Sequence, residues 1–288
     1  MQEILNYALN LRVKNRKDMI SSDDRGSKEK KVREAFSVVG SSVNGLDIEL
    51  YEFFSSNRLK GKDDNYVLFV GGIHGGYEWN TILLAYKIID LIKTDRRFLP
   101  ENVSVGIIPS ANPDGVKRLV NTNFIEFLAE VFFKRKFTKR GRLNSNEVDL
   151  NRNFDCNWQP KSKWGSQVVS GGSKPFSEPE VVAIRDVVFG KSPDAVIFWH
   201  SAVGAVYGSE CNDGILQGTL DIMSAYSKCS GYRIVDSFDH YKITGDAEGW
   251  LASIGIPSIT VELKTYDSIE LERNLRGVKA VLECMERQ

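Results

Sequence analysis

The sequence has no excess of charge of either sign and no apolar run long enough to cross a membrane. Lys and Arg number 38 in total, as do Asp and Glu, so no overall field favours nucleic acid or an acidic membrane surface as a partner. A transmembrane helix would need about 18 or more consecutive apolar residues, and no such run occurs. The N-terminus also lacks the basic and then apolar order of a signal peptide. We therefore expect a cytoplasmic protein that binds neither nucleic acid nor membrane.

Cysteine is scarce as well. The four cysteines are scattered and form no CxxC pair, which excludes a zinc knuckle and a dense disulfide framework. They are Cys156, Cys211, Cys229 and Cys284. We expect reduced thiols, in agreement with a cytosol-like compartment.

The composition is otherwise that of a globular protein. Hydrophobic residues make up 42% of the 288 positions and charged residues 26%, which excludes a mostly disordered or collagen-like chain. A single α/β domain can fill roughly 250 residues. The first 31 residues show loosely helical spacing and then a polar, charged stretch. We therefore predict a helical appendage and linker over 1–31 and one domain over 32–288.

Short apolar runs alternate with helical patterns along this domain. The runs have no polar face, as expected for strands that are buried on both sides of a sheet. We predict strands at 66–70, 104–110, 195–199 and 258–263, and helices at about 79–93, 179–188 and 268–286. This alternation predicts an α/β fold with an open, mainly parallel twisted sheet and helices on both faces. The partly helical and then basic segment 116–141 interrupts the pattern and is predicted to run over the surface.

Polar side chains stand where the predicted strands end. His74 and Glu78 follow the first strand, His200 follows the third, and Glu262 lies in the last one. The chain has three histidines, and two of them occupy these strand ends. Ligands of open parallel sheets bind beyond the carboxyl ends of the strands, so we expect these side chains to meet. Two imidazoles and one carboxylate leave the fourth position of a tetrahedral zinc open, which is the pattern of a catalytic zinc site.

The polar segment 142–154 suits the binding of an anion. Arg142, Asn151 and Arg152 lie in a stretch that is dense in guanidinium and amide groups and poor in apolar residues. Arginine forms bidentate pairs with carboxylates, and asparagine adds a neutral donor. A solvated charged face would explain one arginine but explains the Asn-Arg-Asn run at 151–153 less well. The segment therefore predicts a site for a carboxylate group.

These motifs, in this order, resemble the M14 family of zinc carboxypeptidases. The matching elements span about residues 40 to 270, which is most of the chain. They read GGIHGGYE, ANPDG, RLNSNEVDLNRNF, FWHS and SITVEL. The resemblance implies the carboxypeptidase A-like fold and a hydrolase of peptide bonds with one Zn²⁺ ion per chain as cofactor.

The resemblance also implies roles for the residues around the ion. His74, Glu78 and His200 would bind zinc, and Asp149 would accept a hydrogen bond from a zinc-bound imidazole and so fix its tautomer. The family spacing is His-x-x-Glu, whereas Glu78 stands four residues after His74. One interpretation is a one-residue insertion that still brings the carboxylate to the metal, because the neighbouring glycines make the loop pliable. The other is that Glu78 only hydrogen-bonds nearby and that zinc binding is weakened.

Five further residues are implied to act on the substrate. Glu262 would be the general base and proton shuttle, and Arg142 would polarise the scissile carbonyl and stabilise the oxyanion. Asn151 and Arg152 would hold a free C-terminal carboxylate, and Tyr241 would close over the substrate. The resemblance thus implies a metallocarboxypeptidase that cleaves a peptide with a free carboxyl end by means of zinc-activated water.

The stretch over 244–263 resembles the bacterial branch of the family, which includes murein tripeptide amidases that cut γ-D-glutamyl-diaminopimelate. A cell-wall peptide is therefore the first substrate to consider, followed by a peptide that ends in an ordinary basic or neutral residue. Asp246 could face an amino group on the released residue, because opposite charges attract strongly in a semi-closed pocket. Alternatively, Asp246 is a turn residue after Gly245.

Other functions stay open at this point. The ligands would also suit an N-acyl amino acid amidohydrolase of the aspartoacylase or succinylglutamate desuccinylase type, although the NRNF and TVEL motifs fit the peptidase branch better. A non-catalytic protein that binds peptide ends would be expected to lack a ligand or the base, yet His74, His200 and Glu262 are present. The basic cluster KRKFTKRGR at 134–142 could bind nucleic acid, but it is local, and Arg142 is better assigned to the active site.

Overall fold

The computed structural model of the chain contains an eight-stranded sheet and a separate two-stranded sheet. It describes residues 33–61, 64–118, 141–208, 210–211, 214–236 and 243–287. The predicted appendage over 1–31, most of the segment 116–141, and Tyr241 lie outside the described residues.

The large sheet is mixed, and its centre is parallel. The strands stand in the order β1-β2-β4-β3-β7-β10-β8-β9. Their bounds are β1 Arg33–Ser41, β2 Asp47–Phe54, β3 Asn65–Val70, β4 Val103–Ile108, β7 Ala195–Ser201, β8 Ala205–Gly208, β9 Arg233–Val235 and β10 Ser258–Leu263. β4, β3, β7 and β10 run parallel to one another, whereas β2 pairs antiparallel with β4 on one side of this central group and β8 pairs antiparallel with β10 on the other. The prediction of an open, mainly parallel sheet is confirmed.

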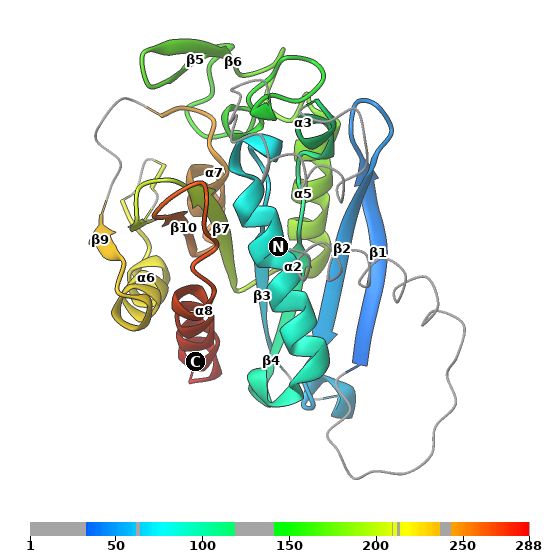
Figure 1. Cartoon of the computed structure of the whole chain (residues 1–288), viewed down its shortest axis with the longest axis vertical. Coiled ribbons are helices and arrows are strands. Elements are labelled where there is room, and N and C mark those ends of the chain that lie inside the picture. The colour runs from blue at the N-terminus through cyan, green and yellow to red at the C-terminus, as the bar shows by residue number, and fades with distance from the viewer. Residues whose placement is uncertain are drawn as a thin grey trace.

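Helices cover both faces of this sheet (Figure 1). The α-helices are α2 Trp79–Thr94, α3 Pro113–Lys117, α5 Pro179–Lys191, α6 Gln217–Ser230, α7 Ala247–Ser253 and α8 Leu271–Glu286. Side chains of β3 alternate between the faces: Val67 and Phe69 pack in one core with α2, α6 and α8, and Leu68 and Val70 pack in a second core with α5 and α7. Among the described residues, no helix has both the length and the apolar character that crossing a bilayer requires.

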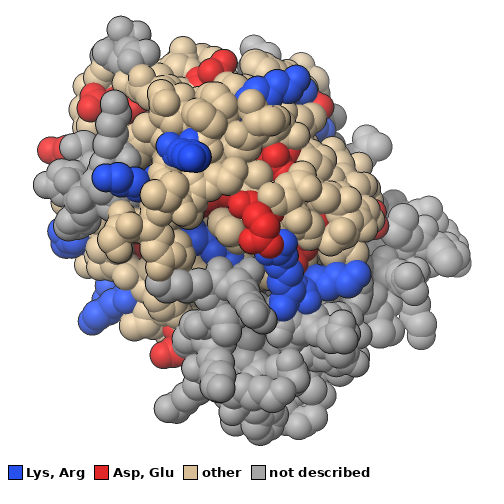
Figure 2. Space-filling view, turned by 90° about the horizontal axis from the view of Figure 1, so that it is seen from above, with Lys and Arg blue, Asp and Glu red and all other residues tan. Residues whose placement is uncertain are grey.

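The carboxyl ends of the central strands meet at one edge of the sheet. This edge lies at the top of Figure 1, next to α3 and the small hairpin of β5 (Lys161–Trp164) and β6 (Gln167–Ser170). The 3-10 turns η2 (Gly75–Glu78) and η5 (Leu150–Arg152) bring further residues to it. Figure 2 looks down on this edge and shows that acidic and basic side chains of the described residues are mixed across it.

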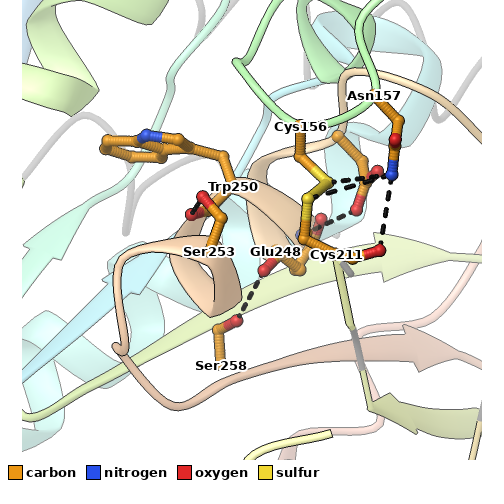
Figure 3. Close-up of a disulfide and its surroundings, with 9 residues drawn as sticks. Cys156, Asn157, Cys211, Glu248, Trp250, Ser253 and Ser258 are labelled. Atoms are coloured by element: carbon orange, nitrogen blue, oxygen red, sulfur yellow. Dashed lines mark hydrogen bonds between the residues drawn. A yellow bond between two sulfur atoms is a disulfide. The ribbon is translucent and has the colours of Figure 1, made fainter. Parts of the chain in front are cut away.

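Cys156 and Cys211 form a disulfide, which corrects the expectation of four reduced thiols (Figure 3). The two residues are 55 positions apart, so their spacing in the sequence carries no sign that the fold brings them together. Cys229 and Cys284 are free. Disulfides persist mainly in oxidising compartments, so this pair removes the cysteine argument for a cytosolic location.

The packing of α6 against α8 depends on a glycine. A Cβ atom at Gly277 would lie 2.4 Å from Cε1 of Tyr226, and the Tyr226 hydroxyl donates a hydrogen bond of 2.7 Å to Oδ1 of Asn274. We expect Gly277→Ala to lower the free energy of unfolding by about 1–2 kcal/mol, because overpacking outweighs the helix propensity that alanine adds. Urea denaturation followed by circular dichroism measures this loss.

Gly190→Ala in α5 is the matched control. No atom lies within 4 Å of a Cβ atom placed at Gly190, so alanine there should raise the free energy of unfolding by about 0.5–1 kcal/mol. Equal effects of the two substitutions would contradict the close contact between α6 and α8.

Candidate metal centre and active site

A loop that requires glycine carries the first two candidate ligands. It follows β3, and His74 and Glu78 stand at the two ends of η2. Gly75 has a φ of +48°, and a Cβ atom there would lie 2.6 Å from the carbonyl oxygen of Gly141 and 2.9 Å from Cα of Gly115. Because glycine has no Cβ atom and tolerates positive φ, the loop can turn tightly against this backbone.

The tight turn brings Glu78 back to the histidines. The ligand atoms of His74, Glu78 and His200 all lie within 4.8 Å of one another. Nδ1 of His200 is 3.2 Å from Oε2 of Glu78, and the two imidazole centroids are 4.9 Å apart. All three side chains are buried. The four-residue spacing therefore still brings the carboxylate to the histidines, in agreement with the first interpretation of the sequence.

Several buried polar atoms in this cluster have no hydrogen-bond partner among the described residues. They are Nδ1 of His74, Oε2 of Glu78, Nε2 of His200 and Oε2 of Glu262. Buried polar atoms are nearly always paired, so such a group at one place requires an explanation. Nδ1 of His74 and Nε2 of His200 each lie 3.5 Å from a carboxylate, of Asp149 and Glu248 respectively. A cation between the imidazoles and Glu78 would satisfy Oε2 of Glu78, and the donor set is one that catalytic zinc uses. The residues present therefore fit zinc.

Asp149 joins this cluster to Arg142. Its Oδ1 lies 3.5 Å from Nδ1 of His74, and its Oδ2 accepts a hydrogen bond of 2.8 Å from Nε of Arg142. Nη1 of Arg142 lies 3.8 Å from Oε1 of Glu78. The ring of Trp164 packs against the guanidinium, with its centroid 4.4 Å from Cζ. Two acids and one aromatic ring thus hold Arg142 in one orientation beside the candidate ligands.

The other two residues of the predicted anion site lie in η5, directly after Asp149. Oδ1 of Asn151 accepts a hydrogen bond of 2.8 Å from the backbone N–H of Ala247, which fixes the orientation of the amide group. Nε of Arg152 donates a hydrogen bond of 3.1 Å to the carbonyl oxygen of Lys163 in β5. Both side chains are buried at the edge of the sheet where the histidines lie.

Burial and neighbouring charges move the pKa values of the two imidazoles in opposite directions. Burial, followed by the positive charge of Arg142, lowers the pKa of His74 well below its ordinary value. Burial also opposes a charge on His200, but the carboxylates of Glu78 and Glu248 outweigh it and raise the pKa to about 10. His74 is therefore ready to bind a metal ion, whereas His200 must release a proton when an ion binds.

Glu262, the predicted base, lies on β10 beside His200. The two residues are partners in the parallel register of β7 and β10. Burial, followed by the negative charge of Glu78, raises the pKa of Glu262 to about 8, although His200 and Arg142 act in the opposite direction. The strand-end argument thus placed this carboxylate correctly at the edge of the cluster.

Asp246 caps the N-terminus of α7. Its Oδ2 accepts a hydrogen bond of 2.8 Å from the backbone N–H of Gly249. Burial, followed by the charge of Glu248, raises the pKa of Asp246 to about 6. The structure therefore agrees with the alternative interpretation of the sequence, in which Asp246 is a turn residue. A contact between Asp246 and the substrate stays a prediction, as does the role of Tyr241, which lies outside the described residues.

The structure adds four residues that the sequence prediction missed. Oε1 of Glu248 lies 3.5 Å from Nε2 of His200. The hydroxyl oxygens of Tyr77 and Tyr266 are 2.7 Å apart, and the ring of Tyr77 packs edge-on against Trp164. Both tyrosines stand within a few positions of predicted site residues, which could have pointed to them. Glu248 has the sequence pattern of an ordinary acid in the first turn of a helix, and Trp164 belongs to a hairpin that was not predicted.

The basic cluster at 134–142 lies outside the described residues except for Gly141 and Arg142. Arg142 is 4% exposed and is paired with two acids of the site. This burial agrees with its assignment to the active site.

Comparison with known proteins agrees with this geometry. A family model described as zinc carboxypeptidase matches residues 27–268. Murein peptide amidase A of Escherichia coli strain K12 is 27% identical over 245 residues, which cover 80% of this chain and 82% of that protein. Gamma-D-glutamyl-L-diamino acid endopeptidase 1 of Lysinibacillus sphaericus is 25% identical over 175 residues, which cover 57% of this chain and 43% of that protein. The match therefore spans less than half of the length of the Lysinibacillus relative.

A solved structure shows the same fold. The crystal structure of carboxypeptidase A from Helicoverpa armigera superposes with a TM-score of 0.68 at 19% identity. The superposition covers 98% of this chain and 80% of that protein. The arrangement of the sheet and helices is therefore that of carboxypeptidase A.

We expect the purified protein to contain about one zinc per chain. The variant His200→Ala should lose the bound zinc, because catalytic zinc sites use three protein ligands and this variant keeps two. Elemental analysis after dialysis measures the content. Cys229→Ser is the control, since Cys229 is an exposed free thiol that could bind zinc adventitiously. A wild-type protein without zinc, or a zinc content that follows Cys229 rather than His200, would contradict the site.

Proposed function

The chain belongs to the zinc carboxypeptidase family, and on this basis we propose that it cleaves the last bond before the free carboxyl end of a short peptide. The observation that carries the proposal is the buried set of His74, Glu78 and His200, whose ligand atoms lie within 4.8 Å of one another beside Arg142. The leading substrate is a cell-wall peptide with a γ-D-glutamyl bond to a diamino acid. The names of the two relatives, a murein peptide amidase and a γ-D-glutamyl-L-diamino acid endopeptidase, support this choice.

The residues at the edge of the sheet have separate tasks in this proposal. Zinc, when bound by His74, Glu78 and His200, acts as a Lewis acid and lowers the pKa of a coordinated water toward about 7. Asp149 orients the ring of His74. Glu262 accepts the proton of the attacking water and passes it to the leaving amine. Its Oε2 has no partner among the described residues, which leaves that oxygen free for the transfer.

Arg142 stabilises the negative charge that develops on the carbonyl oxygen. Asp149 and Trp164 already hold its guanidinium before any substrate is present. A donor that is fixed in advance needs no reorganisation during the reaction, and one such donor is worth about 3–4 kcal/mol of transition-state stabilisation.

Asn151 and Arg152 bind the terminal carboxylate of the substrate. An internal peptide bond offers no carboxylate and would leave the buried charge of Arg152 unpaired, which is costly. Asp246 supplies the complementary charge for the amino group of a diamino acid, through the oxygen that does not cap α7. The chain end and a second amino group would together define the substrate.

The competing functions receive less support. A non-catalytic peptide-binding protein would be expected to lack part of the His-Glu-His set, which is complete here. An N-acyl amino acid amidohydrolase would use the same ligands, so acylated amino acids belong in the substrate panel as a direct comparison.

We expect Glu262→Gln to lower kcat by about 100-fold or more, because general acid–base groups typically contribute 10²- to 10⁴-fold. Zinc content should stay unchanged. Glu52→Gln is the matched control, since Glu52 is also buried but pairs with Tyr66 and Lys191 away from the site. Activity of Glu262→Gln close to that of wild type would remove Glu262 from the role of base.

We expect amidation of the C-terminal carboxylate of a good substrate to lower kcat/KM by about 100-fold, because it leaves the charge of Arg152 without a partner. The comparison uses a γ-D-glutamyl-diaminopimelate tripeptide and its amide, with released diamino acid measured by mass spectrometry. An N-acetyl amino acid and a peptide with a neutral last residue complete the panel. Equal rates for the acid and the amide would point to endopeptidase cleavage and contradict the proposed mode of recognition.

A further inference from the structure

A buried carboxylate of α7 lies on the far side of His200 from Glu78. Nδ1 of the imidazole faces Oε2 of Glu78 at 3.2 Å, and Nε2 faces Oε1 of Glu248 at 3.5 Å. Nε2 is buried and forms no complete hydrogen bond in the described part of the chain. Oε1 of Glu248 is the carboxylate oxygen that faces it. Glu248 itself is 2% exposed.

The neighbours of Glu248 hold its carboxylate in place. Oε1 accepts a hydrogen bond of 2.5 Å from the hydroxyl of Thr260, and the backbone carbonyl accepts one of 3.2 Å from the hydroxyl of Ser258. Both hydroxyls belong to β10, the strand that carries the predicted base. The carboxylate is therefore tied to the sheet rather than free to turn toward water.

The first turn of α7 is anchored from the other side as well. The Asn151 side chain binds the backbone N–H of Ala247, and the Asp246 carboxylate binds that of Gly249. A Cβ atom at Gly249 would lie 3.2 Å from Sγ of Cys156, so the disulfide packs directly against this turn. Figure 3 shows Glu248 below the disulfide, with Ser258 bound to its backbone. The first turn of α7 is thus held in part by Asn151, which lies in the predicted anion-binding segment 142–154, and by Cys156, which follows that segment.

We propose that Glu248 is a positioning residue for the metal site: by accepting the Nε2 proton it holds His200 in the tautomer and orientation that leave Nδ1 for zinc. Asp149 would serve His74 in the same way, since its Oδ1 is also 3.5 Å from the imidazole. Each histidine ligand then has one buried carboxylate beside the ring nitrogen that does not bind zinc. Outer carboxylates of this kind raise the basicity of the ligand and contribute to metal affinity.

The inference rests on the zinc site of the proposed function but not on the identity of the substrate. Its first test is zinc affinity, measured by competition with a chromophoric chelator at fixed pH for wild type, Glu248→Gln and Glu248→Asp. Loss of an outer carboxylate typically weakens metal binding about 10- to 100-fold, and we expect a loss in this range for Glu248→Gln. Glu248→Asp keeps the charge on a shorter side chain and should fall between Glu248→Gln and wild type. The control Glu52→Gln should bind zinc as wild type does.

The second readout separates an effect on His200 from a general loss of structure. The chain has three histidines, so an imidazole ¹⁵N spectrum of the zinc-loaded protein contains few signals. We expect the wild-type spectrum to show one ring bound through Nδ1 with a proton on Nε2. The signals of that ring should shift in Glu248→Gln and stay unchanged in Glu52→Gln.

Each outcome decides the inference. Zinc affinity of Glu248→Gln within about twofold of wild type, with unchanged His200 signals, would overturn the role of Glu248 and leave the zinc site intact. If Glu248→Gln does not fold, wild-type affinity in Glu248→Asp would overturn it instead. A wild-type protein that binds no zinc would overturn the proposed function and this inference together.

Discussion

The free-energy cost of burying charged side chains together at the carboxyl ends of the central strands is the constraint on which the rest of the site depends. Glu78 and Asp149 are 3% and 0% exposed, and Arg142 is 4% exposed. Removing carboxylates from water is costly unless cations or hydrogen-bond donors replace the lost hydration. Arg142 compensates both acids in part, at 2.8 Å from Asp149 and 3.8 Å from Glu78. A divalent ion between Glu78 and the two imidazoles would supply the remainder, which is why the metal site and the stability of this edge cannot be separated.

The fold meets this constraint by bringing the groups together from neighbouring strands and the tight turn after β3. His200 and Glu262 lie on the neighbouring parallel strands β7 and β10 and share one register position. His74 follows β3, the strand on the other side of β7. The loop after β3 turns back tightly only because Gly75 fits between the backbones of two other segments. Catalytic groups held by strands keep their geometry better than groups on long loops, so little rearrangement is needed before reaction.

The central part of the fold and of the site could be predicted from the sequence because it depends on local pattern. Buried parallel strands have a clear apolar signature, and their carboxyl ends are the positions where His200 and Glu262 were expected. The edge strand β1 and its neighbour β2 were not predicted. Along β1 the apolar side chains do not mark a buried face: Phe36 and Val38 remain 43% and 49% exposed.

The parts that were missed depend on contacts between distant segments. Neither the spacing of Cys156 and Cys211 nor the helical pattern around Glu248 indicates which residue lies opposite in the folded chain.

The most direct test of the metal site is X-ray absorption at the zinc edge of the loaded protein. The structure predicts a shell of nitrogen and oxygen ligands at about 2.0–2.2 Å, with two imidazoles and no sulfur. A shell with sulfur at about 2.3 Å, or with fewer than two imidazoles, would contradict coordination by His74, Glu78 and His200.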